Sequence, residues 1–210
     1  MAKKAKIGLP WGFTETVSRI MDVALCEFGT KGFASTSTTD IAKKAGVSKQ
    51  LLYHYFDGKR DIYSNILKHM AEANYNALLA VDYENLPPLE AIRQGFLALY
   101  DIYATDQFSV TIAVDQTLHR GEHIVKDVKS DKLRDELLTK LGASVKKGQE
   151  AGEISMAVNA TSIHIMAVLL ALGRFSFWPM LTLIMNIEPI EDDAVSRADM
   201  AEFYMRAIRA

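Results

Sequence analysis

The side chains best suited to chemistry lie close together in residues 38–56, which read TTDIAKKAGVSKQLLYHYF. This stretch combines hydroxyl, amide, imidazole and ammonium groups with regularly spaced apolar residues. Groups of these kinds exchange hydrogen bonds with phosphate oxygens and with the edges of bases. The chemistry that the stretch favours is therefore non-covalent contact with a nucleic acid.

A second candidate is the segment His119-Arg120-Gly121-Glu122-His123, which fits the H-x-x-E-H pattern of some zinc peptidases. That chemistry needs both histidines on one helix and a third ligand elsewhere, whereas Gly121 falls at the expected end of a helix. No Ser/His/Asp set and no glycine-rich phosphate loop stands out in the sequence. We therefore expect no catalytic residue, no metal site and no cofactor, in a protein that is not an enzyme.

Two short helices must position the polar side chains of residues 38–56. We expect the first over residues 40–45, capped by Thr38, and the second over residues 49–56, capped by Ser48. Gly46 lets the chain turn sharply between them. A small apolar core would join the helices, made of Ile41, Ala42, Ala45, Val47, Leu52, Tyr55 and Phe56. In this arrangement Tyr55 packs inward, and the whole is a helix-turn-helix whose second helix fits the DNA major groove.

The rest of the chain is also expected to be helical, because apolar residues recur about every 3.6 residues in most long windows. A first helix over residues 13–28 ends at glycines, and a long fourth helix covers residues 59–80. Further helices are expected at 89–104, 107–120, 130–150, from 160 to the break at Pro179, and at 192–209. The fold class is therefore all-α with about nine helices. We divide it into an N-terminal domain, residues 1–60 with a basic arm over 1–12, and a C-terminal helical domain, residues 61–210.

Charge is distributed unevenly between these two domains. Residues 1–60 carry ten Lys/Arg and five Asp/Glu, whereas residues 61–210 carry fourteen and twenty-one. A basic part joined to an acidic one is typical of a DNA-binding module attached to a module that does not bind DNA. Lys3, Lys4 and Lys6 suit either a flexible arm that reaches DNA or a solubilising tail.

The cellular compartment is suggested by cysteine usage and by the apolar segments of the chain. Cys26 is the single cysteine, which excludes an internal disulfide and fits a reducing compartment. No apolar signal-peptide core follows the N-terminal lysines. Residues 163–187 are nearly free of charge over a spanning length, but Arg174 and Pro179 favour a buried helix over a membrane span. We expect a cytoplasmic protein with no membrane partner.

An ordered set of short motifs resembles the TetR family of transcriptional regulators. The motifs are Phe28-Gly29, Gly32-Phe33, Thr38-Thr39, Ile41-Ala42, Ala45-Gly46-Val47-Ser48, Leu52-Tyr53, Tyr55-Phe56 and Lys59. They keep the family's spacing over residues 14–66, and beyond residue 66 only the helical pattern and the length resemble the family. The resemblance implies a homodimeric DNA-binding regulator. It further implies a repressor that a small apolar or aromatic ligand releases from a palindromic operator.

The resemblance also implies roles for single side chains. Thr38 would offer its hydroxyl and backbone N–H to a phosphate, and Thr39 would point toward the groove. At the start of the recognition helix, Gln50 suits adenine and Lys49 suits guanine or a phosphate. Lys59 would grip a phosphate. The DNA-binding residues predicted in this way are Thr38, Thr39, Ser48, Lys49, Gln50, Tyr53, His54 and Lys59.

By the same resemblance, the C-terminal domain holds a ligand pocket and a dimer interface. Aromatic walls with a few polar tips suit an apolar effector. The predicted wall residues are Tyr100, Tyr103, Phe108, Gln116, His119, Phe175 and Trp178. The predicted interface, on the last two helices, consists of Ile165, Val168, Leu169, Leu172, Met200, Phe203 and Tyr204. Each of these residues also suits an ordinary hydrophobic core.

Two other functions remain compatible with the sequence. One is a DNA-binding regulator without a small ligand, controlled by a protein partner or acting as an activator. The other is a helical small-molecule carrier or enzyme whose helix-turn-helix is incidental. The second would need a catalytic constellation, and none is visible.

Overall fold

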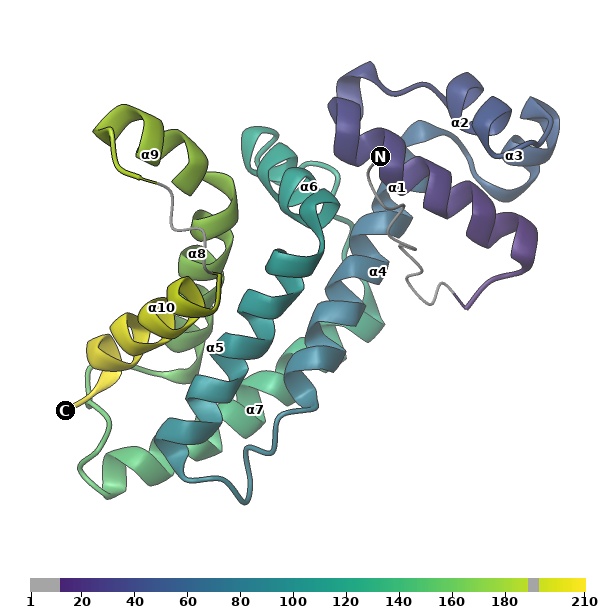
Figure 1. The fold of residues 1–210 in the computed structure, drawn as a ribbon. Helices are drawn as coiled ribbons and strands as arrows, with labels where there is room; N and C mark the ends of the chain where they lie inside the picture. Colours follow the sequence, from purple (N-terminus) through teal and green to yellow (C-terminus); the bar gives the residue numbers. More distant parts are fainter. Residues whose placement is uncertain (1–11, 189–192) are drawn as a thin grey trace. The chain divides into compact units, whose positions relative to one another are not determined.

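The computed structural model describes residues 12–188 and 193–210, so that Lys3, Lys4 and Lys6 of the expected arm lie outside the described residues (Figure 1). Ten α-helices make up the described residues: α1 (Glu15–Ser35), α2 (Thr38–Lys44), α3 (Lys49–Tyr55), α4 (Lys59–Leu79), α5 (Pro88–Thr105), α6 (Gln107–Leu118), α7 (Val128–Glu150), α8 (Ala160–Ser176), α9 (Trp178–Met185) and α10 (Asp193–Ile208). No strand is present in these ranges, where Ile154 and Arg209 form an isolated bridge. The all-α prediction is confirmed.

The tenth helix arises where the expected eighth helix breaks. The chain bends by 60° between α8 and α9, and Pro179 lies in the first turn of α9. A proline lacks the N–H that a helix interior requires, but the first turn of a helix has no partner for that N–H. The break at Pro179 is therefore confirmed, and a new short helix follows it. Residues 12–188 and 193–210 contain no single helix that is long and apolar enough to cross a membrane, although α8 and α9 pass that test as a bent pair.

The chain divides into two compact units, which are treated separately below. The head unit contains residues 12–73 and 111–127, and the body unit contains residues 74–110, 128–188 and 193–210. α4 and α6 each contribute residues to both units. The head unit thus includes a segment that lies well beyond the helix-turn-helix in the sequence.

The head unit has a core built on one face of α1. Ile20, Met21, Ala24 and Leu25 of α1 are buried, and α2 packs against α1 and α3. α1 runs past Gly29 and contains a break at Gly32, whose φ is +74°. A β-carbon at Gly32 would stand 3.3 Å from an Asp115 carboxylate oxygen, so both the backbone and the space favour glycine there.

The 111–127 segment is fixed to the rest of the head unit by a polar network around Tyr63. The Tyr63 hydroxyl donates to Asp115 Oδ2 at 2.6 Å and accepts from Gln116 Nε2 at 3.1 Å. Burial, followed by the hydrogen bond to Asp115, raises the pKa of Tyr63 well above its usual range. His123 is buried beside this network, with its ring centroid 4.0 Å from that of Phe33. Burial lowers the pKa of His123, which favours the neutral imidazole.

Backbone ties complete this attachment. Arg60 donates to the Glu122 carbonyl at 2.7 Å, and the Ser64 hydroxyl donates to the His123 carbonyl at 3.0 Å. α6 ends at Leu118, and positive φ angles at Arg120 and Gly121 turn the chain away from a helix. The H-x-x-E-H pattern therefore does not lie on one helix, and the described residues contain no group of side chains arranged to hold a metal ion.

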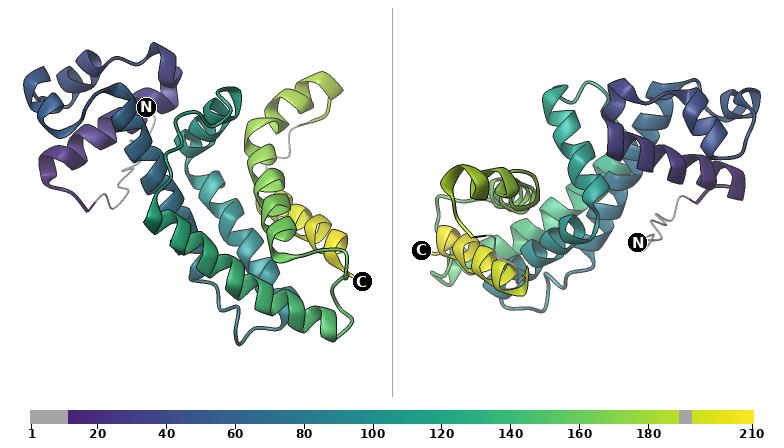
Figure 2. Two further views of the ribbon diagram at one scale, coloured as in Figure 1. Left: turned by 180° about the vertical axis from the view of Figure 1, so that it is seen from behind. Right: turned by 45° about the horizontal axis from the view of Figure 1, so that its top comes forward.

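The body unit is organised around α5, which packs against α7, α8 and α10 (Figure 2). Phe96 of α5 stacks on Tyr204 of α10, with ring centroids 4.8 Å apart. The Tyr204 hydroxyl donates to the Ile163 carbonyl of α8 at 2.8 Å. Aromatic packing and one buried hydrogen bond thus join three helices of this core.

The residues predicted for the dimer interface fall into three groups. Ile165, Leu169 and Phe203 are 51%, 60% and 62% exposed. Val168, Leu172 and Met200 are half-buried against the core of the body unit. Tyr204 is fully buried within the chain and bonded there, so this side chain is a core residue and not an interface residue.

Candidate DNA-binding surface

Two serines start the short helices of the head unit. The Ser37 hydroxyl accepts a hydrogen bond from the Asp40 N–H at 3.1 Å, and the Ser48 hydroxyl accepts one from the Leu51 N–H at 3.0 Å. Each satisfies one of the free N–H groups in the first turn of its helix. The cap of α2 is therefore Ser37 and not Thr38. As a result, the Thr38 hydroxyl is available for other contacts.

Gly46 closes α2 and directs the chain into α3. Its φ is +65°, its N–H bonds the Lys43 carbonyl at 3.3 Å, and the Val47 N–H bonds the Ala42 carbonyl at 3.0 Å. These two bonds make a Schellman motif, in which the residue with positive φ is usually glycine. No atom lies within 4 Å of the place where a β-carbon would stand. Conformation, and not space, therefore selects glycine at this position.

Replacing Gly46 with alanine is expected to destabilise the protein by about 1–2 kcal/mol, the cost of placing an L side chain in the left-handed region. Gly46→Asn is expected to lose less stability than the alanine variant, because asparagine tolerates the left-handed region better than alanine does. Chemical unfolding of the three proteins checks the order glycine, asparagine, alanine. An alanine variant as stable as the original would show that this turn is not what fixes α3.

α3 is held by Leu52 and by the residue that follows the helix. Leu52 is fully buried, and Phe56, in an extended conformation after the last turn, is 5% exposed. Tyr55 was expected in this core, but it is 41% exposed, with its ring centroid 5.1 Å from that of His54. The expectation was wrong because the chain leaves the helix at Phe56, which turns that ring inward and leaves Tyr55 on the outer side.

The outer side of α2 and α3 carries a continuous polar edge, which we call the recognition edge. It consists of Thr38, Thr39, Ser48, Lys49, Gln50, Tyr53 and His54. All but the half-buried Thr38 are exposed. The Thr38 and Tyr53 hydroxyls lie 3.1 Å apart, and the Lys49 ammonium lies 5.8 Å from the centroid of the Tyr53 ring. Two hydroxyls and a cation are thus gathered where the two helices meet, a combination suited to a phosphate.

Lys59 has a position that the sequence did not predict. Its ammonium donates to the carbonyls of Phe33 at 2.9 Å and Ala34 at 3.2 Å, and it lies 4.4 Å from the centroid of the Phe33 ring. A cation is favourable at the C-terminal end of a helix, where carbonyls lack partners. The side chain therefore ties the start of α4 to the end of α1. Its contact with a phosphate stays a prediction.

A buried carboxylate connects α1 to α2 behind the recognition edge. Glu27 is 4% exposed and forms ion pairs with Lys31, at 2.8 Å, and with Lys44 of α2. The hydrogen bonds from Lys31 and Lys44 lower the pKa of Glu27 below its ordinary value of 4.5. The ionised carboxylate thus helps to fix α2 against α1.

Substituting Glu27 by glutamine is expected to destabilise the protein at neutral pH by about 1–3 kcal/mol, since charge-assisted hydrogen bonds are lost. Because the folded pKa is the lower one, the stabilisation is complete above the unfolded value and is lost as the pH falls below it. The difference in unfolding free energy between the two proteins should therefore shrink as the pH falls below the ordinary Glu27 pKa of 4.5. Glu15→Gln, at an exposed position in the first turn of α1, is the control. Parallel pH profiles for Glu27→Gln and the original would contradict the role of the ion pairs.

The predicted ligand-wall residues are not all brought together. Gln116 and His119 belong to the head unit, where Gln116 is part of the Tyr63 network. In the body unit, the rings of Tyr100 and Phe175 lie 4.9 Å apart. The Arg174 guanidinium lies 5.6 Å from the Phe175 ring centroid and 5.5 Å from that of Trp178. Tyr103 is buried on α5 and Phe108 is half-buried on α6.

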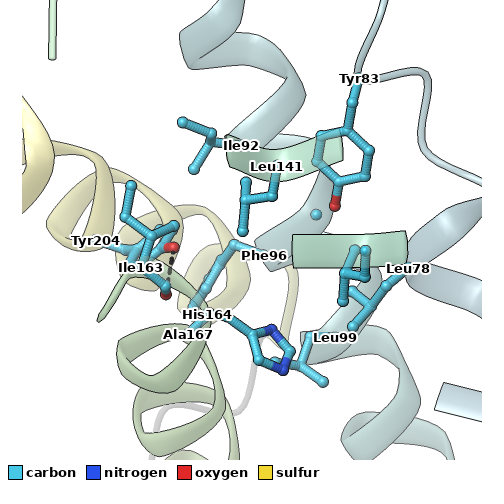
Figure 3. Close-up of a pocket in the computed structure, with 12 residues that line it drawn as sticks. Leu78, Tyr83, Ile92, Phe96, Leu99, Leu141, Ile163, His164, Ala167 and Tyr204 are labelled. Atoms are coloured by element: carbon cyan, nitrogen blue, oxygen red, sulfur yellow. Dashed lines mark hydrogen bonds between the residues drawn. The ribbon is translucent and has the colours of Figure 1, made fainter. Parts of the chain in front are cut away.

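A small cavity lies in the body unit. Its volume is about 20 Å³, enough for roughly one water molecule. α5 contributes Phe96 and Leu99, α8 contributes Ile163, His164 and Ala167, and Tyr83 and Tyr204 complete the polar part of the wall (Figure 3). None of the seven predicted wall residues lines this cavity. The residues that line this cavity could not be predicted from the sequence, because Phe96 and Tyr204 become neighbours only when α5 and α10 pack together.

Comparison with known proteins agrees with this architecture. Residues 20–66 match the family "Bacterial regulatory proteins, tetR family", and residues 88–208 match "Tetracyclin repressor-like, C-terminal domain". The chain is 24% identical over 151 residues to the transcriptional repressor NicS of Pseudomonas putida, which covers 72% of this chain and 71% of that protein. It is 24% identical over 168 residues to the repressor BepR of Brucella suis, covering 78% and 80%.

A solved structure shows the same fold over nearly the whole chain. It is a bacterial regulatory protein of the tetR family from Rhodococcus RHA1, with a TM-score of 0.73 and 16% identity. The alignment covers 93% of this chain and 98% of that one. Because the C-terminal match alone spans more than half of the chain, the protein belongs to the TetR family of DNA-binding transcriptional regulators, which are not enzymes.

Proposed function

We propose that this protein is a homodimeric repressor that binds a palindromic operator through α3 and is released from it by a small, largely apolar or aromatic ligand. The observation that carries the proposal is the recognition edge, a set of polar side chains on α2 and α3 that are all exposed except the half-buried Thr38. Leu52 anchors α3, which carries most of them. The family consists of bacterial regulatory proteins, and a bacterial genome lies in the cytoplasm, so the protein would act there.

The recognition edge supports a division of labour between its residues. Gln50 is exposed in the first turn of α3, where a side chain reaches the floor of the major groove, and an amide can bond adenine at two atoms. The Thr38 and Tyr53 hydroxyls, with Lys49, suit the phosphate backbone. Tyr55 and Leu51, both exposed on the same helix, add apolar area for a thymine methyl group.

A dimer is required because α3 is only seven residues long, too short to specify an operator alone. Two copies bound to half-sites about one helical turn apart double the contacts, and two-fold symmetry of the protein then demands a palindromic site. The exposed Ile165, Leu169 and Phe203 support a contact between copies through α8 and α10.

The body unit supports a ligand site between α5 and α8. The cavity has apolar walls and the polar Tyr83 and His164, and burial lowers the pKa of His164 so that its neutral ring suits an uncharged ligand. Trp178 does not line this cavity, but its buried indole N–H has no hydrogen-bond partner among the described residues. A ligand larger than water would have to widen the cavity, and it would thereby favour a different conformation of the body unit.

α4 and α6 offer the route from such a change to the DNA. Each helix is part of both units, so a tilt of α4 that the ligand favours would also displace the start of that helix in the head unit. The two heads would then no longer match the half-site spacing. This requires the ligand to bind the tilted state more tightly than the DNA-competent one.

Titration of DNA from the protein's own upstream region, followed by fluorescence anisotropy, tests the proposal. Specific binding that weakens with salt is expected, and a bound apolar ligand is expected to raise the dissociation constant. Absence of specific binding at low salt would remove the DNA-binding proposal. A ligand that saturates the body without changing operator affinity would instead favour the second candidate, a regulator controlled by a protein partner, which the small volume of the cavity also favours.

A further inference from the structure

α9 is an eight-residue helix that is apolar on almost every side. Its sequence, WPMLTLIM, contains no charged residue, and Thr182 is its one buried side chain. Leu183, Ile184 and Met185 are 84%, 70% and 63% exposed. A helix that is hydrophobic all round is normally buried, because a flat contact covers only one side of it. α9 therefore needs a groove to occupy.

The outer face of α8 continues this apolar surface. Ile165 and Leu169 are exposed four residues apart on one face of the helix, and the exposed Phe177 directly follows it. Gly173 falls on the same face, and no atom lies within 4 Å of the place where its β-carbon would stand. The face thus presents Ile165 and Leu169, followed by an indentation at Gly173 that lies between Leu169 and Phe177.

A groove of about 610 Å³ lies at the other end of α8. Leu138, Gly142 and Val145 of α7 form one wall, and Thr161 and Ile165 of α8 form the other. Figure 1 shows α9 after the upper end of α8, whereas the connection from α7 enters the lower end. α8 has 17 residues and is therefore roughly 25 Å long. α9 thus lies at the far end of α8 from the groove of its own chain.

In a two-fold symmetric dimer, α9 of one copy can lie close to the groove of the other copy. If α8 packs antiparallel against α8 of a second copy with Leu169 on the axis, position 165 of one copy faces position 173 of the other. Ile165 then fits the indentation at Gly173, and the contact is made twice, as an isologous interface requires. In the same arrangement position 177, directly after α8, lies level along the helix pair with position 161 of the partner, and Thr161 lines the groove.

We propose that α9 of each copy fills the α7–α8 groove of the other copy, so that two reciprocal insertions close the dimer. The inference rests on the dimer of the proposed function and adds its geometry. A lipid surface is a poorer occupant, because interfacial helices combine an apolar face with a charged one. Arg174 is the single Lys or Arg in residues 160–187, and it is bonded to Ser196 at 2.6 Å.

The first test measures the dimer by sedimentation equilibrium. Leu183→Lys/Ile184→Lys is expected to raise the dissociation constant at least about 100-fold, since two buried apolar side chains are lost and two charges would have to be buried. Leu118→Lys/Val128→Lys, which also changes two exposed apolar residues, is expected to leave it unchanged. Circular dichroism checks that both proteins remain folded.

The second test uses cross-linking and does not depend on a disruptive substitution. In a Cys26→Ser background, a chain with Leu183→Cys is mixed with a tagged chain carrying Thr161→Cys, and a short bismaleimide is added. A covalent heterodimer is expected, whereas Lys129→Cys in place of Thr161→Cys, near the far end of α7, is expected to give none.

The outcomes separate this inference from the proposed function. A wild-type dimer that neither the α9 variant nor the cross-linker affects overturns the insertion of α9 and leaves the dimer intact. A wild-type chain that stays monomeric at all concentrations and on DNA overturns both. Co-sedimentation with phosphatidylglycerol vesicles that Leu183→Lys/Ile184→Lys abolishes would assign α9 to a lipid surface and also overturn the insertion.

Discussion

Leu52→Ala is expected to abolish DNA binding and to lower the unfolding free energy by about 2–5 kcal/mol, the usual cost of removing a large buried side chain. Leu52 is fully buried and is the one buried residue within α3, so nothing else in the helix compensates for its loss. A loss of this size is a large part of the roughly 5–15 kcal/mol that stabilises a typical domain. Urea unfolding followed by circular dichroism, together with DNA titration, measures both effects.

Leu51→Ala is the matched control for this prediction. Leu51 is the same residue type one position earlier, but it is 37% exposed. Its substitution is expected to change the unfolding free energy by no more than about 0.5 kcal/mol. Equal stability of the two variants would mean that α3 is not held by Leu52, and the anchoring of the recognition edge would have to be reconsidered.

Gln50→Ala is expected to weaken binding to the operator and to leave binding to random DNA nearly unchanged. A bidentate contact with a base contributes about 1–3 kcal/mol of discrimination, which corresponds to roughly 5- to 150-fold in the dissociation constant. Random DNA does not offer the matching base at this position, so the variant is expected to lose little affinity for it. Anisotropy titrations of one operator and one shuffled duplex, at the same salt concentration, measure the ratio of the two effects.

Lys43→Ala provides the contrasting control. Lys43 is exposed in the last turn of α2 and outside the recognition edge. If its charge acts on the backbone of DNA, the variant should bind both duplexes less tightly, and the salt dependence should fall by about one ion. Equal losses on operator and shuffled DNA for Gln50→Ala would falsify the base-reading role of Gln50.

Features with local causes were predictable from the sequence. α4 and α5 begin and end within a residue of the expected positions. Their starts have local causes: Gly58, before α4, adopts a φ of +147° that a β-carbon would disfavour, and the rings of Pro87 and Pro88 fix φ at the start of α5. The cap at Ser48 and the turn at Gly46 follow from side-chain chemistry within a few residues. The recognition edge could be predicted for the same reason, since seven nearby residues on two short helices define it.

Features that depend on packing were not predictable in this way. Ser37 and Thr38 have the same capping chemistry, and only the backbone at residue 37, which is extended, decides between them. Tyr55 and Phe56 are both aromatic, and the end of α3 determines which ring is buried. Gln116 resembled a pocket residue, but its amide nitrogen donates to the hydroxyl of Tyr63, 53 positions earlier. Contacts of this range leave no periodic signal in the sequence.

The discontinuous head unit has a consequence for synthesis of the chain on the ribosome. The helix-turn-helix is complete by residue 56, but other contacts of the head unit need some sixty more residues of chain. Tyr63 bonds Asp115, the Phe33 ring packs on His123, and Arg60 bonds the Glu122 carbonyl. A nascent chain that has just passed residue 73 therefore exposes aromatic rings that the finished head buries. Completion of the head unit is thus tied to translation of the intervening body segment, and a chimera that grafts residues 1–73 onto another body would carry α3 without the 111–127 segment that packs on α4.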